Sequence, residues 1–156
     1  LHAFLSQAQA QAQGSLLLSV DLNGVQSDSP AHVLEAALPL VDVLHLNEAE
    51  AQVITQQQHS SLSASDPTGL SRAAAYLHDR GVAVVALTLG EQGAYVSVTP
   101  QQARLDGSPA LGRQAGRWAG ESVLLPPAPV TEGAQVNTNG AGDAFIAGLV
   151  AALLVR

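Results

Sequence analysis

Short apolar runs alternate along this chain with segments whose apolar positions recur at helical spacing. Short continuous apolar runs are typical of buried strands, and apolar positions three and four apart are typical of helices that pack on a sheet. The pattern predicts strands at 16–20, 41–46 and 82–87 and helices at 30–40, 48–55 and 70–80. Because strands that alternate with such helices usually form parallel sheets, the sequence predicts an α/β layer architecture with a mostly parallel sheet.

Three further segments extend this pattern towards the C-terminus. Residues 94–98 read as a strand entered through a Gly-Glu-Gln-Gly turn, so we expect an antiparallel hairpin with the preceding strand. Residues 101–120 carry three of the six Arg and the single Trp without a clean period, which indicates a surface insertion. The longest apolar run, 144–155, is too short to cross a bilayer, so we expect a core helix and no membrane partner.

Composition excludes several classes of function. A net charge of −7 and the absence of Lys leave no basic face for a nucleic acid, and they rule out a Walker A loop or a pyridoxal Schiff base. Without Cys there is no disulfide, thiolate nucleophile or Cys-based zinc site, and no secretory signal is visible, so an intracellular location, cytoplasmic or organellar, is expected. The five His are scattered and read as structural or surface residues rather than metal ligands; they stand at positions 2, 32, 45, 59 and 78.

Residues 137–143 read Asn-Thr-Asn-Gly-Ala-Gly-Asp and lead directly into the predicted apolar helix. The N–H groups of Gly140, Ala141 and Gly142 would point out of its first turn, where the helix dipole adds positive charge and favours a phosphate. Asp143 falls in the same turn, where its carboxylate stays ionised and would accept a proton from a substrate hydroxyl. Phosphoryl transfer to an alcohol requires such a base beside an anion site.

Two other interpretations of this segment stay open. Asp143 would merely stabilise the helix start if Thr138 or Asn139 is the capping residue. The glycines would alternatively belong to a dinucleotide-binding turn, although Phe145 stands where that motif has its third Gly. The segment alone therefore does not distinguish an ordinary helix start from a catalytic centre.

Three short motifs occur in order along the chain: Asn-Glu-Ala-Glu at 47–50, Thr-Leu-Gly-Glu-Gln-Gly at 88–93, and Asn-Thr-Asn-Gly-Ala-Gly-Asp-Ala-Phe at 137–145. They resemble three signatures of the PfkB family of sugar and nucleoside kinases, which read Asn-x-x-Glu, Thr-Leu-Gly-x-x-Gly and Asp-Thr-x-Gly-Ala-Gly-Asp-x-Phe. The third motif differs from its signature only at the first fixed position. The resemblance implies a partial three-layer α/β/α, Rossmann-like ribokinase fold, with residues 1–156 as the C-terminal part of the kinase domain.

The resemblance also implies roles for the residues of the first two motifs. Asn47 would contact the phosphates of ATP or their metal shell, and Glu50 would orient a hydrated Mg²⁺ ion. Thr88, Gly90 and Gly93 would line the ATP pocket. The competing interpretations are a helix cap followed by an acid for the first motif and a plain hairpin turn for the second.

The chain departs from the family pattern at two places. Asn137 stands where the signature has Asp, at a position that the family associates with a monovalent cation. Asn137 and Asn139 remain candidate ligands for K⁺, but an amide oxygen attracts K⁺ less than a carboxylate does, so we expect weaker activation by K⁺. Residues 21–23 (Asp-Leu-Asn) resemble a degraded Asp-x-Asn-x-Arg element in which Val25 replaces the Arg.

The implied activity is ATP-dependent phosphorylation of a hydroxyl on a sugar or nucleoside, by a homodimer if the full-length protein assembles. The half of the family domain that supplies the substrate site and lid is missing from this sequence, so we expect the segment alone to be inactive. Without that cover, four residues of the last helix would be exposed and promote self-association: Leu149, Val150, Leu153 and Leu154. Two alternatives stay open, a relative that has lost catalysis and serves as an interaction subunit, and a nucleotide-dependent binding domain unrelated to kinases.

Overall fold

The computed structural model describes residues 2–12, 15–22, 31–56, 62–108, 110–111, 116–130 and 138–154. Five strands form one sheet in the order β1-β2-β3-β4-β5. Their bounds are β1 (Ser19–Asp21), β2 (Val43–Asn47), β3 (Val84–Thr88), β4 (Ala94–Val98) and β5 (Ser122–Leu125). β1, β2 and β3 are parallel, and β4 is antiparallel to both of its neighbours, so four of the five strands share one direction. The predicted mostly parallel sheet and the predicted hairpin are confirmed.

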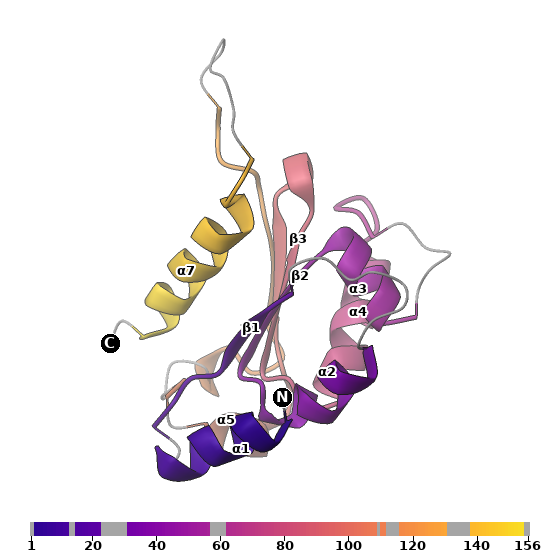
Figure 1. The fold of residues 1–156 in the computed structure, drawn as a ribbon. Helices are drawn as coiled ribbons and strands as arrows, with labels where there is room; N and C mark the ends of the chain where they lie inside the picture. The colour runs from indigo at the N-terminus through magenta and orange to yellow at the C-terminus, as the bar shows by residue number, and fades with distance from the viewer. Residues whose placement is uncertain are drawn as a thin grey trace.

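Helices cover both faces of this sheet (Figure 1). One face carries α2 (Ala31–Ala37), α3 (Glu48–Ile54) and α4 (Pro67–His78), and the other carries α7 (Ala141–Leu154). At the end where the parallel strands begin lie α1 (His2–Gln11) and α5 (Gln102–Asp106). Two short 3₁₀ helices are also described, η1 (Leu38–Leu40) and η2 (Gly90–Gln92). The three-layer α/β/α arrangement is therefore confirmed. None of the described helices has the length and apolar character to cross a membrane.

Local sequence explains where the predicted helices begin and end. α4 starts three residues before its expected first turn, because Pro67 suits that turn and the Asp66 carboxylate accepts a hydrogen bond from the N–H of Gly69 at 2.9 Å. The helix expected at 30–40 is α-helical only to Ala37 and continues as η1, which has Pro39 in its first turn. Gly81 follows α4 with a φ of +98°, as expected for a glycine just beyond a helix.

Two apolar clusters stabilise the two faces of the sheet. The larger lies under α2, α3 and α4 and includes Leu44, Leu77 and Leu87, which are fully buried. The smaller includes Val84 and Leu105 and extends to α7 through Leu153. Leu153 is buried, so the expectation that it would be uncovered is wrong, because it packs on the sheet rather than on a missing layer.

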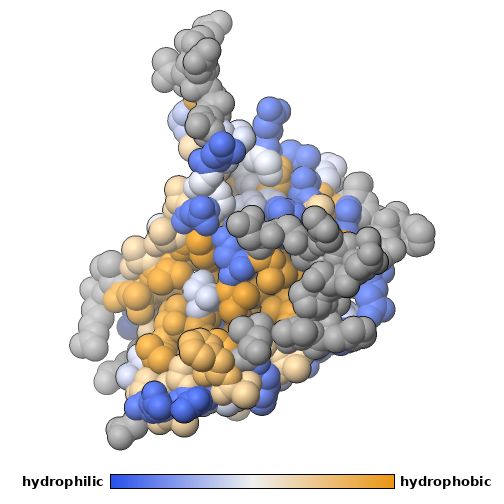
Figure 2. Space-filling model, viewed as in Figure 1, coloured by the Kyte–Doolittle hydropathy of each residue, from blue (hydrophilic) through white to orange (hydrophobic). Residues whose placement is uncertain are grey.

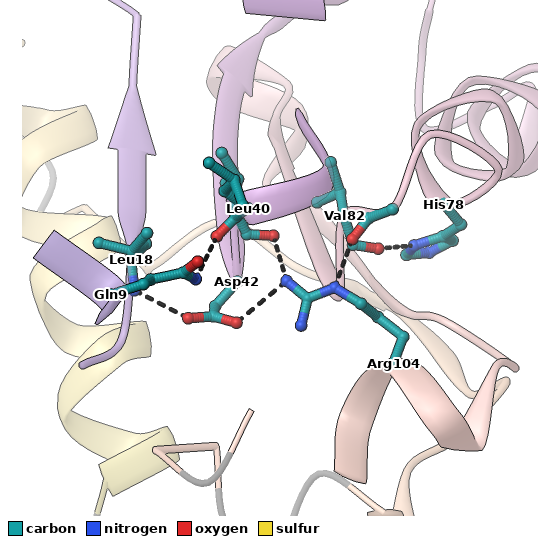
Figure 3. Close-up of polar contacts among 9 residues, drawn as sticks. Gln9, Leu18, Leu40, Asp42, His78, Val82 and Arg104 are labelled. Atoms are coloured by element: carbon teal, nitrogen blue, oxygen red, sulfur yellow. Dashed lines mark hydrogen bonds and ion pairs between the residues drawn. The ribbon is translucent and has the colours of Figure 1, made fainter. Parts of the chain in front are cut away.

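Part of the segment at 101–120 is anchored to the sheet rather than confined to the surface. Leu105 and Leu111 are buried in the smaller cluster. The guanidinium of Arg104 donates hydrogen bonds to the carbonyl of Gly81 at 2.5 Å and of Val41 at 2.9 Å, and it pairs with the buried carboxylate of Asp42 at 3.0 Å (Figure 3). Leu105 and Leu111 therefore belong to the core, whereas most of the described residues around them are exposed. Whether the segment is an insertion relative to other kinases stays a prediction.

Candidate active site

The three parallel strands end together at one end of the sheet (Figure 1). Asp21 at the end of β1 lies beside His45 of β2, and Asn47 at the end of β2 lies beside Thr88 at the end of β3. Ligands of open α/β sheets bind outside the carboxyl ends of the strands. The first two sequence motifs therefore begin on neighbouring strands, at the end of the sheet where a ligand is expected.

Asn47 and Glu50 form a reciprocal cap at the start of α3. Oδ1 of Asn47 accepts a hydrogen bond from the N–H of Glu50 at 2.9 Å, and Oε2 of Glu50 accepts one from the N–H of Asn47 at 2.9 Å. The Glu50 side chain is nearly buried, with the residue 4% exposed. The structure thus contains the capping box that competed with a nucleotide role. A phosphate contact from Asn47 would use its NH₂ group, which the box does not need, and that role stays a prediction.

The turn after β3 contains two glycines in different surroundings. Gly93 has a φ of +95°, and a Cβ at this position would collide with the carbonyl oxygen of Leu125 and lie 2.9 Å from Pro127 N. This position therefore requires glycine, because the end of β5 and the residues after it leave no room for a side chain. Gly90 has a φ of +56°, and a Cβ there would meet no described atom within 4 Å. Gly90 is the glycine of this turn that faces open space, and its role at ATP, like that of Thr88, stays a prediction.

The segment that enters α7 is a tight turn followed by a helix start. Gly140 has a φ of +77°, and its carbonyl accepts the first helical hydrogen bond from the N–H of Ala144 at 2.9 Å. The N–H of Ala141 donates to the carbonyl of Thr138 at 3.1 Å, so anion binding by this group would require that bond to open. Asp143 lies in the exposed first turn, ahead of the first intrahelical donor.

Of the two asparagines considered as ligands of a monovalent cation, the structure describes only Asn139. Asn137 lies outside the described residues. Asn139 is exposed in the turn before α7, in the same turn as Gly140. The cation role of both residues stays a prediction.

His45 is a member of this site that sequence reasoning missed. It is 4% exposed, with Nδ1 at 2.9 Å from Oδ1 of Asp21 and Nε2 at 3.2 Å from Oγ1 of Thr88. Its ring centroid lies 5.8 Å from that of Phe145 on α7. These contacts fit the expected structural role of His45. The sequence did not predict that the residue lies at the candidate site. The available signal was a polar residue inside the apolar run 41–46, two positions before Asn47.

The helix starts of α3 and α7 lie at the same end of the sheet but over opposite faces (Figure 1). His45 lies between them in the sheet and contacts the α7 side. The described residues contain no cluster of three or more His, Asp or Glu side chains that could hold a metal ion. Oε2 of Glu50 is occupied by the N–H of Asn47, and a role of Glu50 at Mg²⁺ stays a prediction.

Comparison with known proteins relates this chain to kinases. The profile of the pfkB family carbohydrate kinases matches residues 2–155. A ribokinase from Haemophilus influenzae is 29% identical over 136 residues, which make up 85% of this chain and 35% of that relative. The chain therefore spans about a third of the length of this curated relative.

Solved structures give the same relationship at the level of the fold. The ribokinase of Arabidopsis thaliana, complexed with ribose and ATP, has a TM-score of 0.65 at 23% identity, over 96% of this chain and 38% of its own. The aminoimidazole riboside kinase of Salmonella enterica, complexed with aminoimidazole riboside and an ATP analog, has a TM-score of 0.60 at 22% identity, over 99% and 42%. Together with the profile match along nearly its whole length, the shared fold shows that this chain belongs to the pfkB family of carbohydrate kinases.

Proposed function

We propose that the protein containing this chain is an ATP-dependent phosphotransferase that phosphorylates a hydroxyl of a sugar or nucleoside. Residues 1–156 would supply the C-terminal, nucleotide-binding and catalytic part of its kinase domain. The single observation that carries the proposal is the exposed first turn of α7, where Asp143 follows Gly140, Ala141 and Gly142 at the ligand-binding end of the sheet.

Asp143 is the proposed catalytic residue. Its carboxylate would accept the proton of the acceptor hydroxyl as the oxygen attacks the γ-phosphate and the bond to the leaving ADP breaks. The amides of Gly140 and Gly142, and that of Ala141 once it is released from Thr138, would donate to the charge that develops on the transferred group. The dipole of the fourteen-residue helix α7 adds positive charge at the same place.

The nucleotide would lie across the ends of β2 and β3. Asn47 would contact its phosphates, and Thr88, Gly90 and Gly93 would line its pocket. Gly93 also shapes the turn, where a Cβ would collide with the carbonyl oxygen of Leu125. Mg²⁺, when bound, would neutralise charge on the phosphates, and Glu50 would orient its water shell. We expect K⁺ at Asn137 and Asn139 to activate the enzyme only weakly, because an amide oxygen attracts K⁺ less than a carboxylate does.

The relatives support a small-molecule acceptor of this class. One neighbouring structure holds ribose and ATP, and another holds aminoimidazole riboside and an ATP analog. Both ligands present a ribose hydroxyl, so a sugar or nucleoside remains the proposed acceptor for the full-length protein. We expect this chain alone to be inactive, because it covers only about two fifths of those structures.

The test is Asp143→Asn in the full-length protein, assayed with ATP and a panel of sugars and nucleosides. Loss of the base should lower kcat by about 10²- to 10⁴-fold while leaving the Kd for ATP nearly unchanged. Asp79→Asn, an exposed carboxylate at the end of α4, is the matched control and should keep full activity. Equal kcat for Asp143→Asn and the wild type would remove Asp143 from the mechanism.

A second candidate function is a non-catalytic interaction subunit. It is favoured by the apolar surface around α7 and β1, which would suit a protein partner (Figure 2). The same assay separates the two candidates, because an interaction subunit would show no turnover in the wild type with any acceptor of the panel.

A further inference from the structure

His45 joins three strands at the proposed site. The imidazole comes from β2, its Nδ1 meets the Asp21 carboxylate of β1, and its Nε2 meets the Thr88 hydroxyl of β3. A carboxylate only accepts, so Nδ1 carries a proton and donates to Asp21; in the neutral ring Nε2 then accepts from the Thr88 hydroxyl. Both ring nitrogens are engaged and the residue is 4% exposed, so the ring is held in one orientation.

The first turn of α7 rests on this ring. A Cβ at Gly142 would lie 3.1 Å from Cε1 of His45, which is closer than the ordinary contact of about 3.5–4.0 Å between carbon atoms. One turn further on, Phe145 lies against the same imidazole at a ring separation of 5.8 Å and an interplanar angle of 44°. A Cβ at Gly142 would thus point at the sheet, and the helix or the imidazole would have to move by a few tenths of an ångström to accommodate it.

We propose that His45 is a positioning residue that sets the height and direction of the first turn of α7 above the ends of β1, β2 and β3. The inference rests on the proposed function in one respect: Asp143 is the neighbour of Gly142, so a displaced turn moves the proposed base. His45 is almost fully buried, so it would act through Gly142 and Phe145. It also fixes Thr88, so one side chain sets the spacing between the proposed ATP turn and the proposed base.

Gly142→Ala and His45→Asn, alone and combined in the full-length protein, test this inference. Asn replaces the Nδ1 donor to Asp21 but has no atom at the position of Cε1. In the His45 background, the added methyl should push α7 outwards, lower kcat about tenfold and lower the urea midpoint. In the His45→Asn background, the same methyl should lower kcat less than threefold and raise the midpoint, because alanine favours the helix once the contact is gone.

Gly148→Ala is the matched control on α7, since a Cβ there meets no described atom within 4 Å. It should leave kcat unchanged and raise the midpoint equally in both backgrounds. If His45→Asn does not fold, His45→Ser also lacks Cε1 and replaces it in the cycle.

Each outcome of the cycle decides one proposal. A Gly142→Ala effect that is the same in both backgrounds would overturn the role of His45 and indicate that the methyl obstructs the phosphate instead. Wild-type protein without turnover would overturn the proposed kinase function, and the urea midpoints would then decide the His45 inference alone. A change of sign in the midpoint shift supports it, and the same sign in both backgrounds overturns it.

Discussion

The two faces of the sheet differ in how they are stabilised. On the face of α2, α3 and α4, apolar side chains are closely packed, and Leu44, Leu77 and Leu87 are fully buried. On the other face, α7 has fourteen residues, of which Leu153 is buried and Leu154 is 51% exposed. The edge strand β5 is exposed at all four residues. The proposed catalytic turn therefore belongs to the less covered face.

The less covered region continues as an apolar surface around α7 and β1 (Figure 2). Exposed apolar side chains in the described residues include Phe4, Leu16 and Leu154. A continuous apolar surface of this kind is typical of an interface. We therefore expect further protein to cover the α7 face in the full-length protein, and we expect the isolated chain to self-associate.

The largest expected effect contrasts one leucine from each face. Leu77→Ala on α4 removes a fully buried side chain and should lower the free energy of unfolding by about 2–5 kcal/mol. Leu154→Ala on α7 is its matched control, because both are helical Leu→Ala changes, and it should shift that free energy by less than about 0.5 kcal/mol when the isolated chain is diluted until it is monomeric. Urea unfolding measures both; equal costs would mean that another copy already covers α7.

A smaller effect is expected at Arg104, the polar anchor of α5 at the end of the sheet where the parallel strands begin. Arg104→Ala removes three hydrogen bonds. It leaves the Asp42 carboxylate, whose side chain is 2% exposed, with a hydrogen bond from the N–H of Leu18. Breaking a buried pair in this way should cost about 3 kcal/mol in unfolding free energy. Arg72→Ala, at an exposed position of α4, should cost almost nothing. If both variants unfold at the same urea concentration, the anchor contributes no stability.

The smallest effect concerns pH and the buried imidazole of His78 on α4. Desolvation by burial lowers the pKa of His78 below its ordinary value of about 6.5, against smaller opposing effects of the Val82 carbonyl and Asp79. Below that ordinary value the unfolded chain binds a proton that the folded chain resists, so stability falls as the pH decreases. His78→Gln should reduce this loss between pH 7.5 and 5.5, as measured by urea midpoints. A slope that is unchanged in the variant would assign the pH dependence to other groups.

Local patterns predicted most of the fold because they report burial along each element. The runs at 41–46 and 82–87 became β2 and β3, shifted by one or two residues, and the Gly-rich turn gave the β3–β4 hairpin. β5 and α5 were not predicted. β5 is exposed along its whole length and owes its conformation to pairing with β4, so its side chains carry no periodic signal.

The candidate site was predicted in part for a similar reason. The turn before α7 is readable because a left-handed Gly140 and a helix start have a local signature. The capping box of Asn47 and Glu50 has an equally local signature, and so the sequence could not separate capping from nucleotide binding. The structure shows that the capping box forms, and it does not exclude nucleotide binding by the same residues.

The sequence by itself determined the class of fold, the three motifs and the residue types that phosphoryl transfer needs, since each depends on neighbours along the chain. Only the tertiary structure decided which residues meet across it. The carboxylate of Asp21, the imidazole of His45 and the hydroxyl of Thr88 come from three strands, and Gly142, about a hundred residues after His45, approaches that imidazole from a helix. Such contacts depend on sheet register and helix docking, which no local pattern of polar and apolar residues encodes.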